Sequence, residues 1–281
     1  MRILSTLLIL GFTTAPVLAQ VADTKPDTPS AIAATTKVTD PLLLAMQQEL
    51  QREQAKLVLP GLQRPYYMQY RLEDIATWEA VANYGALTSE NANHQRVVRV
   101  EVRIGDYTSD SSSARGEGSL QLAPEDNDPD ALKYALWTAT DEAYKSALRA
   151  YATKQATLKQ FQTSPTASDF TPAKPVTEIE PVLTLEIDRD EWKHRLVDAS
   201  GLFASSPETR GFANTVQGST ASVTAIVINR YTVSTDGTTM RHSYAEYSDS
   251  ISIAGQASDG MELARANGST ATTAAGLEDA A

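Results

Sequence analysis

Histidines are the first residues to consider for catalysis, and the chain has three of them, His94, His194 and His242. None lies in a His-Glu-x-x-His or His-Glu-x-x-x-His sequence, the spacings with which one helix presents two imidazoles to a catalytic zinc ion. Glu191 and His194 are three residues apart in a predicted helix, but a di-iron site of that kind needs a second such pair. We therefore interpret His94, in a predicted polar loop, and His242, beside a predicted hairpin, as surface residues.

Four acidic residues lie around the start of the longest predicted helix, and their alternation suggests a calcium loop. They are Glu125, Asp126, Asp128 and Asp130. A calcium loop of the EF-hand type also needs a glycine at its sixth position and a bidentate glutamate at its twelfth, which are missing here. Negative charge is favoured at a helix N-terminus without any metal, and this explanation fits better. Since the sequence also has no nucleophile elbow and no phosphate-binding loop, we predict no catalytic residue, no metal ligand and no cofactor in this chain.

The composition is that of an ordinary globular chain with an acidic balance. Of the 281 residues, 42% are apolar and 21% are charged, which is enough apolar material for a sizeable core. The formal net charge is -11, so we predict no nucleic-acid partner. Cysteine is absent from the sequence, which excludes thiol catalysis and disulfides and leaves packing to stabilise the fold.

The first 19 residues have the three parts of a cleavable signal peptide. Arg2 provides the positive start, residues 3–12 the apolar run, and Ala19 ends a small-residue cleavage site. We expect cleavage after Ala19 and a periplasmic or secreted mature protein. The apolar run is too short to span a bilayer, so we predict no transmembrane segment. Residues 20–39 show no apolar periodicity, which predicts a disordered linker.

The ordered domain is predicted to extend over residues 40–265 and to contain three helices. Asp40 followed by Pro41 is a strong helix start, and a second such pair at 128–129 begins a helix of about thirty residues. A Pro-rich loop or linker over about 163–187 leads to a short third helix over 188–203. Residues 266–281 are small and polar, which predicts a disordered tail.

Alternating apolar and polar residues predict antiparallel strands on both sides of the long helix. The segments with this period are 66–73, 78–84, 98–104, 223–233 and 244–253, with a turn at Asp236-Gly237 between the last two. Because such strands have one apolar face, we predict an α+β fold. In this fold an antiparallel β-sheet is packed by one long helix and two shorter helices.

Tyrosine is frequent, with eleven Tyr against five Phe. Tyr231, Tyr244 and Tyr247 lie in the predicted C-terminal hairpin, and these three are our candidates for contacts with an extended peptide. The alternative is that such tyrosines pack against a helix layer with their hydroxyl groups at the rim.

Four short segments carry a family resemblance. They are residues 59–71 (LPGLQRPYYMQYR), 102–107 (VRIGDY), 136–147 (LWTATDEAYKSA) and 230–238 (RYTVSTDGT). Together they resemble the N-terminal region of secreted members of the TldD/PmbA peptidase family, historically called modulators of DNA gyrase. The resemblance extends over residues 40–265.

This resemblance implies a zinc-dependent peptidase, or its inactive partner, that assembles as a dimer around an internal chamber for extended, unfolded peptides. In the family, a His-Glu-x-x-x-His helix and a further ligand hold the zinc, and they belong to the part that follows the N-terminal domain. This sequence contains no such motif, so no catalytic residue carries over. Typical members are cytoplasmic, and the predicted signal peptide agrees only with the secreted subset.

Two hypotheses from different functional classes follow. In the first, the chain is the non-catalytic N-terminal domain of a secreted TldD/PmbA-like metallopeptidase, either truncated or working beside a catalytic subunit. It then contributes to assembly, as part of a homo- or hetero-oligomer, and to the peptide channel. In the second, it is a free-standing periplasmic protein that captures extended peptides by β-strand addition. A stable lone monomer would favour the second.

Overall fold

The computed structural model describes residues 40–112, 118–161, 167–207 and 209–277. The predicted signal peptide over 1–19 and the predicted linker over 20–39 lie outside these ranges, and so do residues 278–281 of the predicted tail. In the described ranges, no helix combines the length and the apolar character that a membrane-crossing helix requires.

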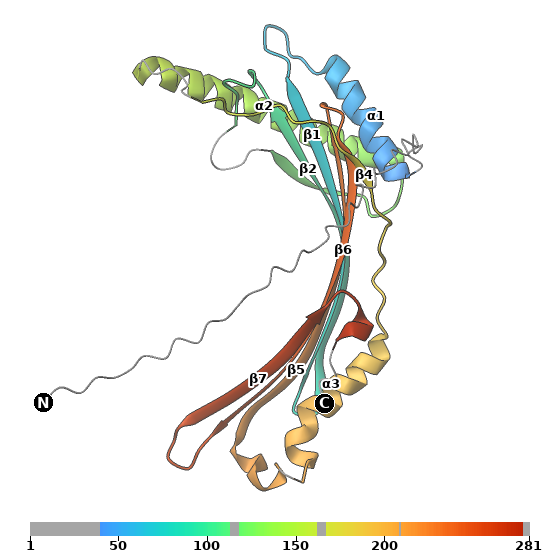
Figure 1. The fold of residues 1–281 in the computed structure, drawn as a ribbon, viewed down its shortest axis with the longest axis vertical. Coiled ribbons are helices and arrows are strands. Elements are labelled where there is room, and N and C mark those ends of the chain that lie inside the picture. Colours follow the sequence, from blue (N-terminus) through green and yellow to red (C-terminus); the bar gives the residue numbers. More distant parts are fainter. Residues whose placement is uncertain (1–39, 113–117, 162–166, 208, 278–281) are drawn as a thin grey trace, which may run out of the picture. The chain divides into compact units, whose positions relative to one another are not determined.

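Seven strands of the described chain form one sheet (Figure 1). They are β1 (Tyr67–Asn83), β2 (Ala86–Arg103), β3 (Ser119–Ala123), β4 (Thr177–Ile179), β5 (Val216–Ser234), β6 (Thr239–Gln256) and β7 (Glu262–Ala271). Their order is β3-β2-β1-β5-β6-β4, and β7 pairs with another part of β6. All neighbours are antiparallel except β4 and β6.

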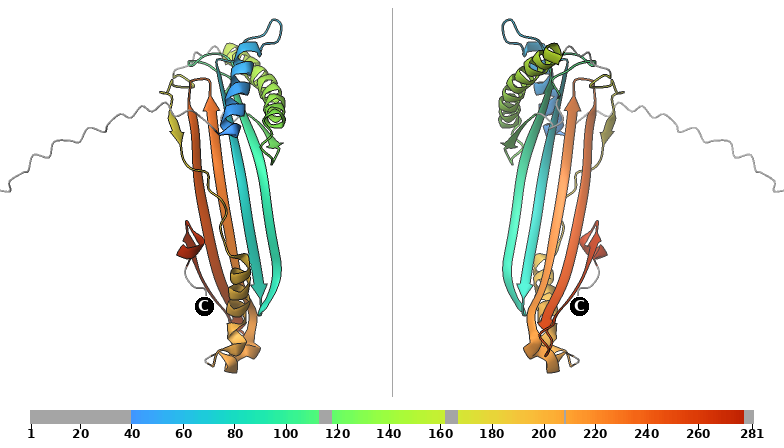
Figure 2. Two further views of the ribbon diagram at one scale, coloured as in Figure 1. Left: turned by 90° about the vertical axis from the view of Figure 1, so that its right-hand side faces the viewer. Right: turned by 90° about the vertical axis from the view of Figure 1, so that its left-hand side faces the viewer.

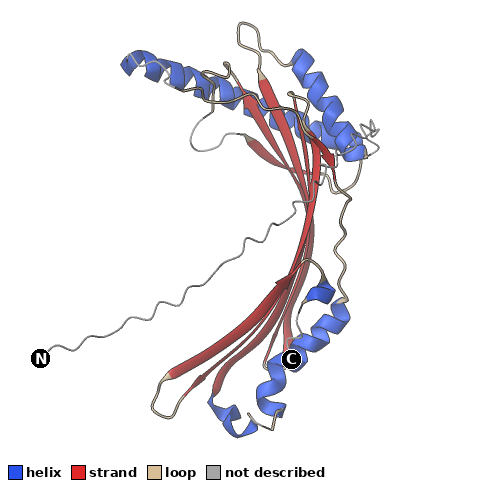
Figure 3. Cartoon of the chain, viewed as in Figure 1, coloured by secondary structure: helices blue, strands red, loops and turns tan. Residues whose placement is uncertain are grey.

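In the part of the chain that the structure describes, three helices accompany the sheet, as Figure 3 shows with helices in blue. They are α1 (Pro41–Lys56), α2 (Pro129–Phe161) and α3 (Arg189–Ser205), with two short 3₁₀ helices, η1 (Arg210–Thr215) and η2 (Ala274–Gly276). The predicted α+β fold, an antiparallel sheet with one long helix and two shorter ones, is confirmed. Asp40 caps α1 as its sequence indicates, because its carboxylate accepts from the backbone nitrogens of Leu42 and Leu43 at 2.9 and 3.1 Å.

The sheet has two faces with different coverings. We call the face with the even-numbered residues of β1, Met68 to Ala82, the helix face, and the face with the odd-numbered residues, Tyr67 to Asn83, the open face. On the helix face the strand residues are mostly buried, whereas those of the open face are mostly half-buried. This difference follows from the period of two in the strands, which sends alternate side chains to opposite faces.

The helices cover the helix face at its two ends, as Figure 2 shows in two side views. At one end α1 and α2 pack on β1, β2 and β5, and this core includes Leu43, Met46, Tyr70, Val100, Leu136 and Tyr144. At the other end α3 packs on β1, β2 and β5, and this core includes Trp78, Trp192, Leu196, Val223, Tyr247 and Leu277. The apolar stripes of the helices and the apolar alternation of the strands therefore meet in two separate cores.

Two strand predictions need correction. The segments 66–73 and 78–84 are parts of one strand, because residues 74–77 also stay paired with β2 and β5. The polar Asp74 is accommodated on the helix face by the guanidinium of Arg96 at 3.0 Å. His94 lies in β2 opposite Ala76 and not in a polar loop. Its Nε2 atom is 2.5 Å from Asp74 Oδ1, so a polar pair occupies this part of the strands. The strand prediction depended on alternating apolar residues and therefore missed it.

The predicted tail after residue 265 is wrong for residues 266–277. These residues form most of β7, which pairs with β6 from Glu262 to Ala271, and then η2. Leu277 is buried in the core under α3. Backbone pairing needs no apolar side chains, so a small, polar segment can form an edge strand that its composition does not predict.

Candidate functional site

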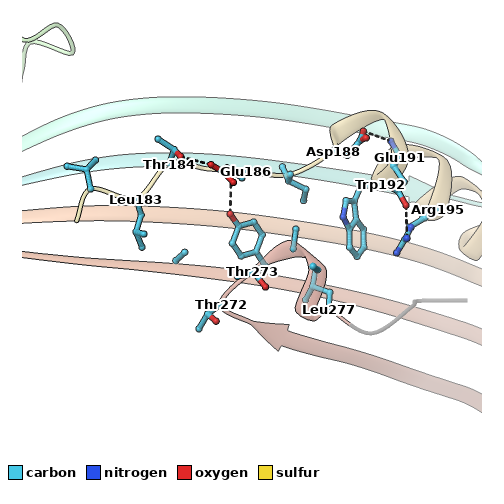
Figure 4. Close-up of a pocket in the computed structure, with 16 residues that line it drawn as sticks. Leu183, Thr184, Glu186, Asp188, Glu191, Trp192, Arg195, Thr272, Thr273 and Leu277 are labelled. Atoms are coloured by element: carbon cyan, nitrogen blue, oxygen red, sulfur yellow. Dashed lines mark hydrogen bonds and ion pairs between the residues drawn. The ribbon is translucent and has the colours of Figure 1, made fainter. Parts of the chain in front are cut away.

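A groove of about 1000 Å³ lies on the helix face between α3, β6, η2 and the loop that precedes α3 (Figure 4). Trp192, Tyr247 and Leu277 are buried side chains that form its floor. Its remaining walls come from residues 182–184 and 186–188, Glu191, Arg195, Ala245 and 272–275. The groove is therefore built from three segments that are distant in sequence and that the sheet brings together.

The α3 side of the groove follows from its helix cap. Asp188 accepts a hydrogen bond from the backbone nitrogen of Glu191 at 3.0 Å and so starts the helix. The next turn then places Glu191, Trp192 and Arg195 along the groove. The guanidinium of Arg195 lies 2.6 Å from Glu191 Oε1 and 5.3 Å from the centre of the Trp192 ring. These contacts fix an aromatic surface with charges at its edge.

The loop side of the groove is attached to the sheet by three hydrogen bonds. The side-chain amide of Asn229 on β5 accepts from the backbone nitrogen of Leu183 at 2.9 Å and donates to its carbonyl oxygen at 3.0 Å. Further along, the backbone nitrogen of Glu186 donates to the hydroxyl group of Tyr247 at 3.2 Å. Tyr247 thus serves both as floor of the groove and as anchor of its wall.

One edge of β6 opens beside the groove. The backbone nitrogen of Thr239 donates to Val176 at 2.8 Å, and the carbonyl of Arg241 accepts from Glu180 at 3.0 Å, so these two residues direct their peptide groups away from β5. Since alternate residues of a strand face the same neighbour, Ala245 does the same. The pairing with β4 ends at Arg241 and the pairing with β7 begins at Tyr247. No strand of the described chain lies beside Ala245 between these points.

The charges around the groove are mainly negative. Glu186, Asp188 and Glu191 contribute carboxylates, while Arg195 is the basic residue of the lining and is paired with Glu191. In the described residues, no group of three or more His, Asp or Glu side chains could hold a metal ion. An apolar floor, an acidic rim and an unpaired strand edge suit the binding of an extended segment that carries apolar and basic side chains.

The three tyrosines predicted to contact peptide do not lie together. Tyr231 is 2% exposed, lies on the helix face under α1, and has its pKa raised to about 12, mainly by burial. Tyr247 is 3% exposed and lines the groove. Tyr244 is 38% exposed and its position in β6 places it on the open face. Peptide contact at these residues stays a prediction, and only Tyr247 belongs to the groove.

The histidines and the acidic cluster have ordinary structural roles. His242 Nδ1 lies 2.9 Å from a carboxylate oxygen of Glu180, and His194 is exposed on α3, where Glu191 pairs with Arg195 instead. In the acidic cluster, Asp128 Oδ1 accepts from the backbone nitrogen of Asp130 at 2.9 Å at the start of α2. The cluster therefore caps a helix, as its position in the sequence indicates.

A second polar cluster lies where β1 and β2 approach the loop after β2. The hydroxyl of Tyr66 donates to Asp110 Oδ2 at 2.6 Å, and Arg103 Nη1 donates to the same atom at 3.2 Å. Burial alone would raise the pKa of the Asp110 carboxyl, but the hydrogen bonds from Ser112 and Tyr66 and the charge of Arg103 lower it overall. The Arg103 guanidinium also stacks 3.9 Å from the centre of the Phe170 ring. Every charge here has a partner, so the cluster stabilises the fold.

The chain matches no protein-family model and no curated protein sequence. Solved structures with a similar fold include a protein described as a modulator of a DNA gyrase from Thermotoga maritima, with TM-score 0.47 and 11% identity. A second is TldE from Thermococcus kodakarensis, with TM-score 0.43 and 12% identity. A third is a protein described as a modulator of DNA gyrase from Bacteroides thetaiotaomicron, with TM-score 0.48 and 10% identity. These neighbours are TldD/PmbA-family proteins.

The alignments cover 84%, 81% and 85% of this chain, in the same order, and 45%, 43% and 46% of the three neighbours. The chain therefore spans less than half the length of the structures that it resembles. At these identities the likeness concerns the fold alone.

Proposed function

We propose that this chain is a non-catalytic domain of a secreted TldD/PmbA-like metallopeptidase, and that it contributes to assembly and to the channel for extended peptides. Secretion is inferred from the predicted signal peptide over residues 1–19. In this proposal the zinc ligands belong to another part of the assembly, in a homo- or hetero-oligomer with a TldD/PmbA-like subunit.

One observation carries the proposal: the segments with the sequence resemblance meet in space. The backbone nitrogen of Tyr66 donates to the carbonyl of Arg103 at 3.0 Å, which joins the first segment to the second. The hydroxyl groups of Tyr70 and Thr140 lie 2.9 Å apart and join it to the third. The backbone nitrogen of Thr235 donates to Met68 at 2.9 Å and joins it to the fourth. The resemblance thus falls on one contiguous structural unit, which supports a common origin over independent chance similarities.

The experiment is coexpression of the chain with a TldD/PmbA-like protein from the same genome that carries a His-Glu-x-x-x-His motif. Size-exclusion chromatography with light scattering measures complex formation, zinc analysis measures metal content, and degradation of β-casein, an unfolded protein, measures activity. We expect a stable complex that degrades casein, while the purified chain alone holds no zinc and leaves casein intact. A partner with both motif histidines replaced by alanine is the control, because it retains the assembly surface.

Two results would contradict the proposal. The first is zinc uptake together with casein cleavage by the purified chain alone. The second is a chain that elutes as a monomer in the presence of every motif-bearing partner of its genome.

The open edge of β6 favours a second candidate function, the capture of extended peptides by a free-standing protein. Strand addition at this edge would use the outward N–H and carbonyl of Ala245, because the N–H of Ser243 already donates to Glu180 and Tyr247 already pairs with β7. A side chain of the peptide would then lie on Trp192. Ala245→Pro tests this, because proline removes the outward N–H without disturbing the ladder to β5. If the lone chain binds a basic, apolar peptide such as acetyl-Lys-Leu-Lys-Leu-Lys-amide, Ala245→Pro is expected to abolish binding, and the control Ala245→Val to retain it.

A further inference from the structure

Arg71 and Arg99 are register partners on the neighbouring strands β1 and β2, and both belong to the open face. Directly opposed residues of antiparallel strands have Cβ atoms about 5 Å apart, so two positive side chains emerge side by side here. In the described residues, neither guanidinium has an ion pair, a hydrogen bond or an aromatic ring as partner. Like charges in this position are destabilising unless an anion lies between them.

The other arginines on the open face beside this pair are neutralised. Arg103 pairs with Asp110 and Arg230 pairs with Glu73. The two carboxylates closest to the arginine pair along the strands are Glu73 and Glu101. Glu73 is 2.8 Å from Arg230 and Glu101 is 2.6 Å from Arg103, so both are already engaged.

Arg71 also has an unsatisfied donor. Its Nε atom is inaccessible to solvent and has no hydrogen-bond partner among the residues that the structure describes. A buried donor without a partner destabilises the fold, and more strongly when the group is charged. An oxyanion arriving from solvent cannot reach this Nε atom, but it would accept from the Nη atoms of the same guanidinium and would relieve its repulsion with Arg99.

The neighbouring residues indicate what carries the anion. On the β2 side, Leu120 of β3 is opposite Arg99, and Leu122 follows two residues later on the same face. These leucines are 55% and 72% exposed. On the β1 side, Thr232 of β5 is opposite Arg71. The residues that lie opposite one another across β5, β1, β2 and β3 at this level therefore combine a positively charged pair with an exposed apolar surface.

From these observations we propose that Arg71 and Arg99 bind a carboxylate of an extended peptide whose apolar side chains lie on Leu120 and Leu122. A carboxylate matches the planar fork of arginine with two parallel hydrogen bonds. A dianion such as phosphate meets more long-range repulsion from a chain of net charge -11. The carboxylate is either the C-terminus of the peptide or an acidic side chain.

The test uses isothermal titration calorimetry of the purified chain with three peptides. They are acetyl-Gly-Leu-Ala-Leu with a free carboxylate, the same peptide as C-terminal amide, and acetyl-Gly-Leu-Glu-Leu-amide. We expect the free acid or the glutamate peptide to bind and the uncharged amide to bind at least about tenfold more weakly, as a lost charge-assisted hydrogen bond predicts. Which of the two charged peptides binds identifies the source of the carboxylate.

Matched variants separate binding from folding. Arg71→Gln and Arg99→Gln are each expected to weaken the binding of the charged peptide about tenfold or more. Arg71→Lys keeps the positive charge but loses the planar guanidinium, and it is also expected to weaken this binding. Arg265→Gln removes an exposed arginine of β7 and is the control with the same change in net charge. Without peptide, Arg99→Gln is expected to raise the thermal unfolding midpoint, because it relieves the repulsion with Arg71.

The proposal is overturned if the three peptides bind equally or not at all, or if inorganic phosphate binds and the charged peptides do not. It is also overturned if Arg99→Gln lowers the unfolding midpoint while peptide affinity is unchanged, since the arginines would then serve the fold. These outcomes concern the lone chain, so they leave assembly with a catalytic subunit, the subject of the proposed function, to be decided by its own experiment.

Discussion

The hydroxyl groups of Tyr70 on β1 and Thr140 on α2 lie 2.9 Å apart in the interior, and both side chains are fully buried. Thr140 also reaches the carbonyl oxygen of Leu136 at 2.7 Å, whereas Tyr70 has no other hydrogen-bond partner in the described chain. The long helix and the central strand are thus joined by this polar contact within an apolar core. If this contact is broken, Thr140 keeps a hydrogen bond to Leu136, whereas the hydroxyl group of Tyr70 is left without a partner among the described residues.

This inequality predicts that Thr140→Val is more damaging than Tyr70→Phe. The valine leaves the Tyr70 hydroxyl buried without a partner, at a cost of about 1–3 kcal/mol in the free energy of unfolding. The phenylalanine removes the tyrosine hydroxyl and leaves Thr140 bonded to Leu136, at a cost of about 1 kcal/mol. Urea unfolding of both variants measures the difference. Equal losses, or a larger loss for Tyr70→Phe, would contradict this assignment.

A second prediction concerns Asp40, which has two functions at the start of α1. One carboxylate oxygen caps the helix and the other pairs with Arg241 of β6. Asp40→Ala removes both interactions and is expected to lower the free energy of unfolding by about 3 kcal/mol. Asp40→Asn can still accept from the helix nitrogens, so about 1–2 kcal/mol is expected. Thermal unfolding compares the two, and an Asn variant as unstable as the Ala variant would show that the cap contributes little.

A third prediction uses two glycines that both have a positive φ angle. Gly105 has φ +105°, and a Cβ there would lie 2.3 Å from the carbonyl oxygen of Ser109 and 2.7 Å from a ring atom of Tyr151. Gly61 has φ +77° with open space around it. Gly61→Ala is therefore expected to cost about 1 kcal/mol for the backbone alone, and Gly105→Ala about 3 kcal/mol or more. If chemical unfolding finds similar losses for the two, the loop after β2 is able to move aside without penalty.

Much of the fold could be predicted because its signals are local. Asp40 followed by Pro41 predicts a helix start, because the aspartate caps the first turn and proline has a φ angle that suits the first helical position. The alternation around Tyr70 and around Val100 predicts strands with one buried face. The prediction failed where stability comes from pairing. β7 has hardly any apolar alternation, and its place depends on the backbone of β6, which no local pattern reveals.

The candidate site was less predictable than the fold. Trp192, Tyr247 and Leu277 come from three distant segments, and only the completed sheet places them in one groove. Of these three residues, Leu277 is a large apolar residue in a segment of small and polar residues, and this contrast could have predicted that the segment packs against the core. Arg71 and Arg99 each occupy an ordinary polar position in a strand, and only the register shows that they are opposite each other.

The last prediction is a pH dependence caused by Asp110. Its folded-state pKa is lowered, since hydrogen bonds from Ser112 and Tyr66 and the charge of Arg103 outweigh the effect of burial. A carboxyl whose pKa is lower in the folded than in the unfolded chain stabilises the fold above its unfolded pKa, about 3.9 for aspartate. This stabilisation is lost as the pH falls through the folded value. The unfolding midpoint of the parent chain is therefore expected to fall steeply below about pH 4.

Asp110→Asn removes this contribution, because the amide does not titrate. Its midpoint is expected to be lower than that of the parent at neutral pH, since Arg103 loses an ionic partner, and to fall less steeply on acidification. Asp198→Asn, at an exposed position of α3, is the control and should keep the slope of the parent. Urea midpoints measured from neutral pH down to about pH 3 give the three slopes. Parallel curves for the parent and Asp110→Asn would mean that other carboxylates account for acid unfolding and that the ion pair with Arg103 is not its cause.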